Sequence, residues 1–234
     1  MKINCTFFNF YGLFIILSII IGIVYFDIIL IKWKIKKIHL FIINALLFIF
    51  VTIFGLGLTI IENYIADHKF IIGFSSYGGL LGMITAIYLF SKILKYNKKH
   101  LYKILFITAP LMYSISKIGC LLTGCCYGIK YNGIGNIIYI SSNGAPLNTP
   151  LFPIQLIESI LFMLIFIYLN ILYKKNKNII PISLLLCGFS KFCLEFLRNS
   201  WKPLISFTQI ISIIFIIIGF ILLERNKKKY ERKH

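Results

Sequence analysis

The chain has 234 residues, of which 59% are apolar and only 14% are charged, and its mean hydropathy is +0.89. This composition excludes a soluble globular domain and indicates a membrane protein that crosses the bilayer several times. The formal net charge of +18 is spread over short loops without a nucleic-acid-binding motif, so we expect no nucleic-acid partner.

Seven apolar runs are each about 20 residues long, which is enough for a helix to cross roughly 30 Å of hydrocarbon. In chain order they lie at about 10–31, 40–63, 71–92, 102–123, 152–173, 179–199 and 204–223. We therefore predict an all-α fold with seven transmembrane helices, built as a single domain over residues 1–234. The first run is too long for a cleavable signal peptide and no small-residue cleavage site follows it, so we expect it to remain as a membrane helix.

Basic residues concentrate in alternate loops. Of the 25 Lys and Arg residues, 18 follow the first, third, fifth and seventh runs. Because such residues mark the cytoplasmic side, this pattern predicts an outside N-terminus and a basic cytoplasmic tail at about 224–234. Basic residues in these loops are also attracted to anionic lipid headgroups, which gives a second reason for the positive net charge. The connection at about 124–151 is rich in Gly, Asn, Ser and Pro, which predicts an irregular outer loop, with room for a short hairpin, that caps a site.

Charged residues inside the apolar runs predict a functional site, because a charge within a bilayer costs at least a few kcal/mol. In the sixth run, Lys191, Glu195 and Arg198 are spaced to share one helix face. Lys117 lies near the outer end of the fourth run. Three cations in the outer leaflet suit an anionic headgroup such as a phosphate. A purely structural ion-pair network of Lys191, Glu195 and Arg198 is the alternative.

Further polar or small residues lie in the outer halves of the runs. They are Tyr11, Tyr77, Gly78, Gly79, Gln155, Glu158 and Gln209. Instead of a role in the site, the glycines could allow close packing of helices. The alternative for Tyr11 is that of an aromatic residue at the membrane interface.

Six cysteines are present, and three of them, Cys120, Cys125 and Cys126, fall near the predicted outer surface. An oxidising environment would allow one pair of these three to form a disulfide, and the sequence leaves open which pair. A zinc site normally needs a second thiol pair or histidines nearby, and the four histidines lie in loops or at the terminus. We therefore expect no metal and no cofactor.

The motifs on these runs resemble those of the prolipoprotein diacylglyceryl transferase family, in order and along most of the chain. The matching segments are residues 10–12, 77–82, 117–128, 152–158, 191–198 and 208–212. The resemblance implies seven spans with the N-terminus outside, in agreement with the topology reached from the basic residues. It also implies a bacterial cytoplasmic membrane protein whose active site faces the outer leaflet.

The resemblance implies transfer of the diacylglyceryl group of phosphatidylglycerol to the lipobox cysteine thiol of a lipoprotein precursor. Phosphatidylglycerol, the precursor's signal peptide and membrane lipids would then be the partners. By position, Lys117 and Lys191 would be catalytic, together with Tyr77 and Tyr11. The implied substrate-binding residues are Lys117, Arg198, Glu195, Gln155, Glu158, Gln209, Gly78, Gly79 and Gly128.

The chain departs from the family pattern at four of these motif positions. Tyr77 replaces a usual histidine, Lys117 and Lys191 replace usual arginines, and Cys120 replaces a usual asparagine. Lysine cannot form the two-pronged contact that arginine makes with a phosphate. The alternative is therefore a divergent non-transferase that keeps a cationic lipid-binding cavity, such as a lipid- or thiol-binding protein or a transporter.

Overall fold

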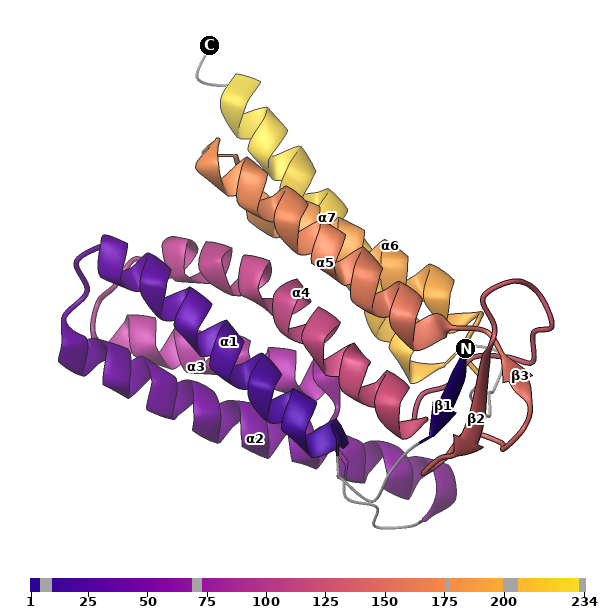
Figure 1. Cartoon of the computed structure of the whole chain (residues 1–234). Helices are drawn as coiled ribbons and strands as arrows, with labels where there is room; N and C mark the ends of the chain where they lie inside the picture. The colour runs from indigo at the N-terminus through magenta and orange to yellow at the C-terminus, as the bar shows by residue number, and fades with distance from the viewer. Residues whose placement is uncertain (5–9, 69–72, 176, 200–205, 232–234) are drawn as a thin grey trace. The chain divides into compact units, whose positions relative to one another are not determined.

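The computed structural model describes residues 1–4, 10–68, 73–175, 177–199 and 206–231. Each predicted span corresponds to one helix (Figure 1). The helices are α1 (Phe10–Lys32), α2 (Lys37–Asp67), α3 (Ser76–Ile93), α4 (Lys98–Thr123), α5 (Ile154–Lys174), α6 (Ile179–Glu195) and α7 (Phe207–Glu231). Cys5, one of the six cysteines, and Lys69 and Lys202, two of the 25 basic residues, lie outside the described residues.

Five helices are long and apolar enough to cross a membrane, namely α1, α2, α4, α5 and α7. Helix α3 has 18 residues and begins with Ser76, Tyr77 and two glycines, which lower its hydropathy. Helix α6 has 17 residues and ends at Glu195, four residues before the predicted boundary. Helix α7 continues to Glu231, so most of the predicted basic tail is helical. The chain is thus a mostly helical membrane protein.

The prediction of an all-α fold missed a small sheet. Strand β2 (Ile137–Ser141) pairs antiparallel with β3 (Pro150–Leu151), which is the hairpin allowed for in the loop. Strand β1 (Lys2–Asn4) adds to β2 in parallel, with Ile3 opposite Tyr139. Three residues at the start of the chain carry too little periodicity to predict a strand, because β1 is formed by its partner rather than by its own pattern.

Two compact units can be distinguished, one made of residues 1–21 and 110–234 and the other of residues 22–109. In the first unit, the sheet covers a small apolar core that joins it to the end of α4. This core contains Ile3, Leu121, Ile137, Tyr139, Ala145 and Leu151, with Tyr127 packed against it. The loop predicted as irregular is therefore held by its own buried core.

In the second unit, helices α2 and α3 pack closely because α3 presents glycines to the backbone of α2. A Cβ atom on Gly82 would collide with the Phe50 carbonyl oxygen and lie 2.8 Å from the Cα atom of Val51. A Cβ on Gly78 would likewise collide with the Phe54 carbonyl oxygen. The predicted packing role of these glycines is thus supported by the contact between the two helices.

We expect Gly82→Ala to destabilise the protein by about 1–3 kcal/mol, because the new methyl group has no room against α2. Gly57→Ala on α2 is the matched control, since nothing lies within 4 Å of a Cβ built there. Helix propensity alone favours alanine over glycine by about 1 kcal/mol, so the control should be neutral or stabilising. Thermal unfolding of the detergent-purified protein, followed by far-ultraviolet circular dichroism, measures both. Equal melting temperatures for the two variants would contradict the packing account.

Candidate functional site

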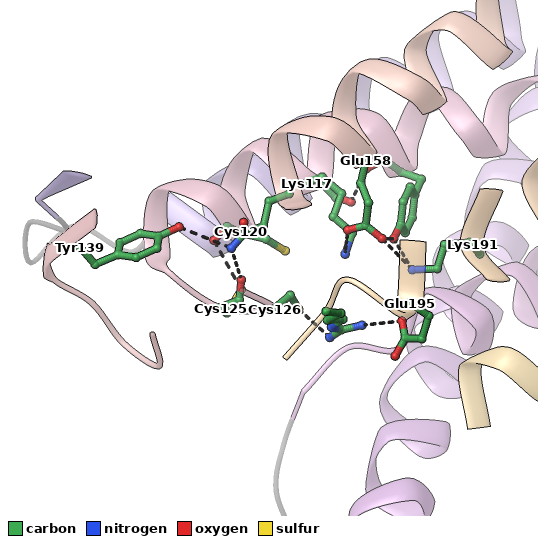
Figure 2. Close-up of polar contacts among 12 residues, drawn as sticks. Lys117, Cys120, Cys125, Cys126, Tyr139, Glu158, Lys191 and Glu195 are labelled. Atoms are coloured by element: carbon green, nitrogen blue, oxygen red, sulfur yellow. Dashed lines mark hydrogen bonds and ion pairs between the residues drawn. The ribbon is translucent and has the colours of Figure 1, made fainter. Parts of the chain in front are cut away.

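A buried carboxylate shared by two lysines forms the centre of the candidate site. Glu158 on α5 forms two ion pairs, one between Oε2 and Nζ of Lys117 of α4 at 2.7 Å and one between Oε1 and Nζ of Lys191 of α6 at 2.8 Å. Their exposed fractions are 1% for Glu158, 5% for Lys117 and 7% for Lys191. Figure 2 shows the three side chains converging from three helices. Ions this deeply buried persist only when they are paired.

Tyr113 completes this cluster and was missed in the sequence analysis. Its hydroxyl donates to Oε1 of Glu158 at 2.7 Å and accepts from Nζ of Lys191 at 2.7 Å. Both lysine ammonium groups also lie over its ring, at 4.9 Å for Lys117 and 5.0 Å for Lys191. The available signal was its spacing, because a tyrosine four residues before Lys117 shares the same helix face.

A second charged group follows the end of α6. Arg198 lies 3.6 Å from Oε2 of Glu195 and donates from Nη2 to the Sγ atom of Cys126 at 3.0 Å. Both contacts are drawn in Figure 2. The predicted network of Lys191, Glu195 and Arg198 is therefore divided, since Lys191 pairs with Glu158 and Arg198 pairs with Glu195. Glu158 was predicted as a site residue, but its position between the two lysines was not.

The loop between α4 and α5 reaches this site and is fixed to it by side-chain hydrogen bonds. Gln155, at the start of α5, donates to the carbonyl oxygen of Cys125 at 2.9 Å and to the Tyr139 hydroxyl at 3.4 Å. Tyr139 in turn donates to the carbonyl oxygen of Leu121 at 2.9 Å. Because Gln155 is 1% exposed, these bonds are protected from water and hold the loop against α4 and α5.

Backbone contacts also join the loop to the segment that carries Arg198. Gly128 forms an isolated antiparallel bridge with Arg198, and Ile129 donates to the Leu197 carbonyl oxygen at 3.1 Å. A Cβ atom on Gly128 would collide with the Phe152 carbonyl oxygen. Gly128 thus has a packing reason to be glycine, and its predicted substrate contact stays a proposal.

Cys120, Cys125 and Cys126 lie together at the end of α4 (Figure 2). Their Sγ atoms are all within 4.8 Å of one another. None of the five cysteines in the described part of the chain forms a disulfide. Hydrogen bonding from Cys120 and Cys125, aided by the charges of Lys117 and Arg198, holds the pKa of Cys126 well below the usual range of a thiol. The Cys126 sulfur is also the one that accepts the hydrogen bond from Arg198.

The remaining predicted residues fall in different places. Tyr11 is half-buried and lies within electrostatic range of Lys117 and of the three cysteines. Gln209 accepts from the Ser206 backbone N–H at 2.9 Å, and its own N–H donates to the Ser206 hydroxyl at 3.2 Å. This reciprocal pair is a capping box at the start of α7. Tyr77, Gly78 and Gly79 belong to the other compact unit.

The charges of the first unit decide what this site can bind. Lys117, Lys191 and Arg198 supply three positive charges against the two carboxylates of Glu158 and Glu195. These five residues leave one positive charge in excess, which suits an anionic group. The Sγ atom of Cys126 accepts a hydrogen bond from Arg198 at 3.0 Å. The arrangement thus places a thiol beside a cationic region.

Comparisons with known proteins agree with these motifs. Curated relatives include phosphatidylglycerol–prolipoprotein diacylglyceryl transferase 2 of Clostridium perfringens, 33% identical over 163 residues that make up 67% of this chain and 64% of the relative. The Clostridium tetani relative named as this transferase is 30% identical over 63% of this chain and 61% of its own length. One from Aeromonas hydrophila is 32% identical over 64% of this chain and 57% of its own length.

The chain therefore matches somewhat less than two thirds of the length of these curated relatives. The family model described as prolipoprotein diacylglyceryl transferase, in contrast, matches residues 1–225. That range includes the charged cluster, the cysteines and the outer loop. Because the match covers nearly the whole sequence, the chain belongs to the prolipoprotein diacylglyceryl transferase family.

Proposed function

We propose that the protein transfers the diacylglyceryl group of phosphatidylglycerol to the cysteine thiol of a lipoprotein precursor. The names of its relatives state phosphatidylglycerol and prolipoprotein as the substrates of those proteins. The observation that carries the proposal to this chain is the cluster of Lys117, Lys191 and Arg198. Lys117 on α4 and Lys191 on α6 are buried, and Arg198, just after α6, is partly exposed. Together they carry one positive charge more than the carboxylates of Glu158 and Glu195 that pair with them.

The proposed reaction breaks a carbon–oxygen bond and forms a carbon–sulfur bond. The acceptor thiol loses its proton, and its sulfur attacks the glyceryl carbon that carries the phosphate. The phosphate oxygen leaves with the bonding electron pair, which yields glycerol phosphate and a thioether. Negative charge grows on that oxygen in the transition state, so fixed cations nearby accelerate the reaction. We assign this role to Lys117 and Lys191, with Arg198 binding the phosphate.

Other residues are assigned supporting roles in this proposal. Glu158 places both lysines by pairing with them, and Glu195 orients Arg198. Gln155 and Gly128 hold the outer loop over the site. Tyr11 lies within electrostatic range of the cysteines and of Lys117, and we assign it a catalytic role from its place in the family motif. The family motifs alone support a catalytic role for Tyr77 and substrate-binding roles for Gly78, Gly79 and Gln209.

We propose further that the protein is one seven-span domain of the bacterial cytoplasmic membrane, with the site facing the outer leaflet. Each of the seven predicted spans contains a helix, and the basic loops favour an outside N-terminus. The lipid substrate and the precursor's signal peptide would both reach the site from the membrane. The alternative is a lipid-binding protein without transferase activity, which the closed pairing of both lysines with Glu158 favours.

The first prediction concerns activity. Purified protein given phosphatidylglycerol and a lipobox peptide should form a thioether product, detected by mass spectrometry. Lys117→Ala and Lys191→Ala should each reduce the rate by about 10²–10³, the usual loss when one stabilising group is removed. Glu158 keeps one lysine partner in each variant, so both should still fold. Lys117→Arg retains the charge and should lose less activity than Lys117→Ala.

Lys130→Ala is the matched control, since Lys130 is an exposed lysine on the same outer loop. It should react at the wild-type rate. Absence of product with the wild-type protein, under conditions in which an authentic transferase works, would contradict the proposed function. Wild-type rates in both lysine variants would contradict the catalytic role of Lys117 and Lys191 but not the transferase function.

A second prediction concerns the shared carboxylate. Glu158→Gln should destabilise the protein by about 3–5 kcal/mol, because two buried ammonium groups lose their common counterion. Glu224→Gln makes the same chemical change at an exposed position and should leave the melting temperature unchanged. Thermal unfolding of both variants in one detergent compares them. A melting temperature for Glu158→Gln equal to that of the control would show that the pairing adds nothing to stability.

The proposed orientation predicts which loops a membrane-impermeant maleimide can label. In a cysteine-free background, Asn143→Cys on the outer loop should be labelled in intact cells. Lys99→Cys, on the loop side assigned to the cytoplasm, should be labelled only after the cells are permeabilised. Both positions are exposed in the structure, so burial does not limit the reaction. The reverse labelling pattern would invert the proposed topology.

A further inference from the structure

Three sulfur atoms converge at the outer end of α4 through the geometry of the turn that follows it. Cys120 lies on the last turns of the helix, and Gly124 (φ +74°) and Cys126 (φ +56°) then adopt left-handed conformations. The chain doubles back, and the Sγ atoms of Cys120, Cys125 and Cys126 come within 4.8 Å of one another. A left-handed cysteine is strained, and strain of this kind is concentrated at functional sites.

This spacing is close to that of a metal centre. A tetrahedral zinc ion with Zn–S bonds of about 2.3 Å holds its sulfur ligands about 3.8 Å apart. Sulfurs already within 4.8 Å therefore need shifts of roughly 1 Å or less, which side-chain rotation supplies. Sulfur-only ligands select thiophilic ions such as Zn²⁺ over Mg²⁺ or Ca²⁺. Three protein ligands with one open position is the composition of catalytic zinc sites.

The surrounding charges suit such a centre. Three thiolates and one Zn²⁺ carry one negative charge in total, which is costly to bury without compensation. Arg198 donates a hydrogen bond of 3.0 Å to Cys126, and Lys117 lies within electrostatic range of both Cys120 and Cys126. Hydrogen bonds from surrounding residues to the ligands are a regular part of metal sites and tune their affinity. Arg198 is thus an independent observation in favour of thiolate ligands at this position.

A closed structural zinc site has four protein donors, and no histidine lies beside the three cysteines in the sequence. The turn after α4 instead assembles three sulfurs, and an open site requires no fourth protein ligand. Gln155 supports this arrangement because its hydrogen bond to the Cys125 carbonyl oxygen fixes the turn on α5.

We propose that Cys120, Cys125 and Cys126 bind a thiophilic divalent ion such as Zn²⁺, and that its fourth position takes the thiol of the acceptor cysteine. The second part rests on the proposed transferase function. A thiol that coordinates a metal loses its proton, here to solvent, and keeps a lone pair for attack. The sulfur then bonds to the glyceryl carbon while the phosphate oxygen departs with the electron pair. The metal keeps its charge throughout, so no oxidant or reductant is needed.

The metal site is tested by cobalt substitution of the full-length protein, purified anaerobically without chelators. Co²⁺ should bind at about one ion per chain and give the thiolate-to-cobalt charge-transfer band that cysteine ligation produces. Zinc content, measured by inductively coupled plasma mass spectrometry, should also be about one. Cys120→Ser and Cys126→Ser should each lose the band. Cys193→Ser is the matched control, because Cys193 is an exposed cysteine on α6, and it should keep the band.

Arg198→Gln tests the site while leaving all three proposed metal ligands in place. It should weaken Co²⁺ binding by about 10–100-fold, the usual effect of losing a residue that hydrogen-bonds to a ligand. No charge-transfer band in the wild type, or a full band in Cys126→Ser, would overturn the proposal. A disulfide among the three cysteines in the anaerobic protein, seen as a mass lower by two hydrogens, would overturn it as well.

The open position is tested by adding a lipobox peptide to the cobalt-loaded protein. A peptide with cysteine should change the cobalt spectrum, whereas the same peptide with serine should not. No change with the cysteine peptide would overturn the second part. If the band appears but no thioether product forms, the transferase function fails and the metal site stands. Full activity after a chelator has removed all metal would overturn the metal's part in the reaction and leave the function standing.

Discussion

The pairing of one buried glutamate with two lysines is the constraint on which the first compact unit depends. Glu158, Lys117 and Lys191 come from α5, α4 and α6, so their contacts join three helices in the region least able to tolerate an unpaired charge. Tyr113 bridges Glu158 and Lys191 and is held below both ammonium groups. A site built in this way has its charges in place before any substrate arrives, which is the arrangement that favours catalysis of charge-separating reactions.

The loop after α4 relates this charged cluster to the cysteines. A small apolar core and the hydrogen bonds of Gln155 and Tyr139 hold the loop on the ends of α4 and α5. The same loop carries Cys126 to Arg198. Arg198 therefore connects the cationic region with the thiol cluster, and a substrate phosphate and a sulfur nucleophile would meet close to it. The proposed lipid-binding and thiol-activating groups therefore lie next to each other.

Much of the fold was predictable from the sequence because hydrophobic runs determine membrane helices. The positions of all seven helices followed from them, and the six family motifs identified Lys117, Glu158, Lys191 and Arg198. The partners of these residues were not predictable. Lys191 and Glu195 share a helix face, but Lys191 pairs with Glu158, 33 residues away, because helix packing and not spacing along one helix decides the contact. Strand β1 escaped prediction for a similar reason, since its pairing with β2 spans most of the chain.

The central claim is that the buried cations hold the phosphate of phosphatidylglycerol. Cryo-electron microscopy of the protein in nanodiscs that contain phosphatidylglycerol tests it most directly. The account predicts density for the lipid phosphate within hydrogen-bond distance of Arg198 and of at least one of Lys117 and Lys191. A headgroup bound elsewhere, with both lysines still closed on Glu158 and Arg198 still on Cys126, would contradict the account.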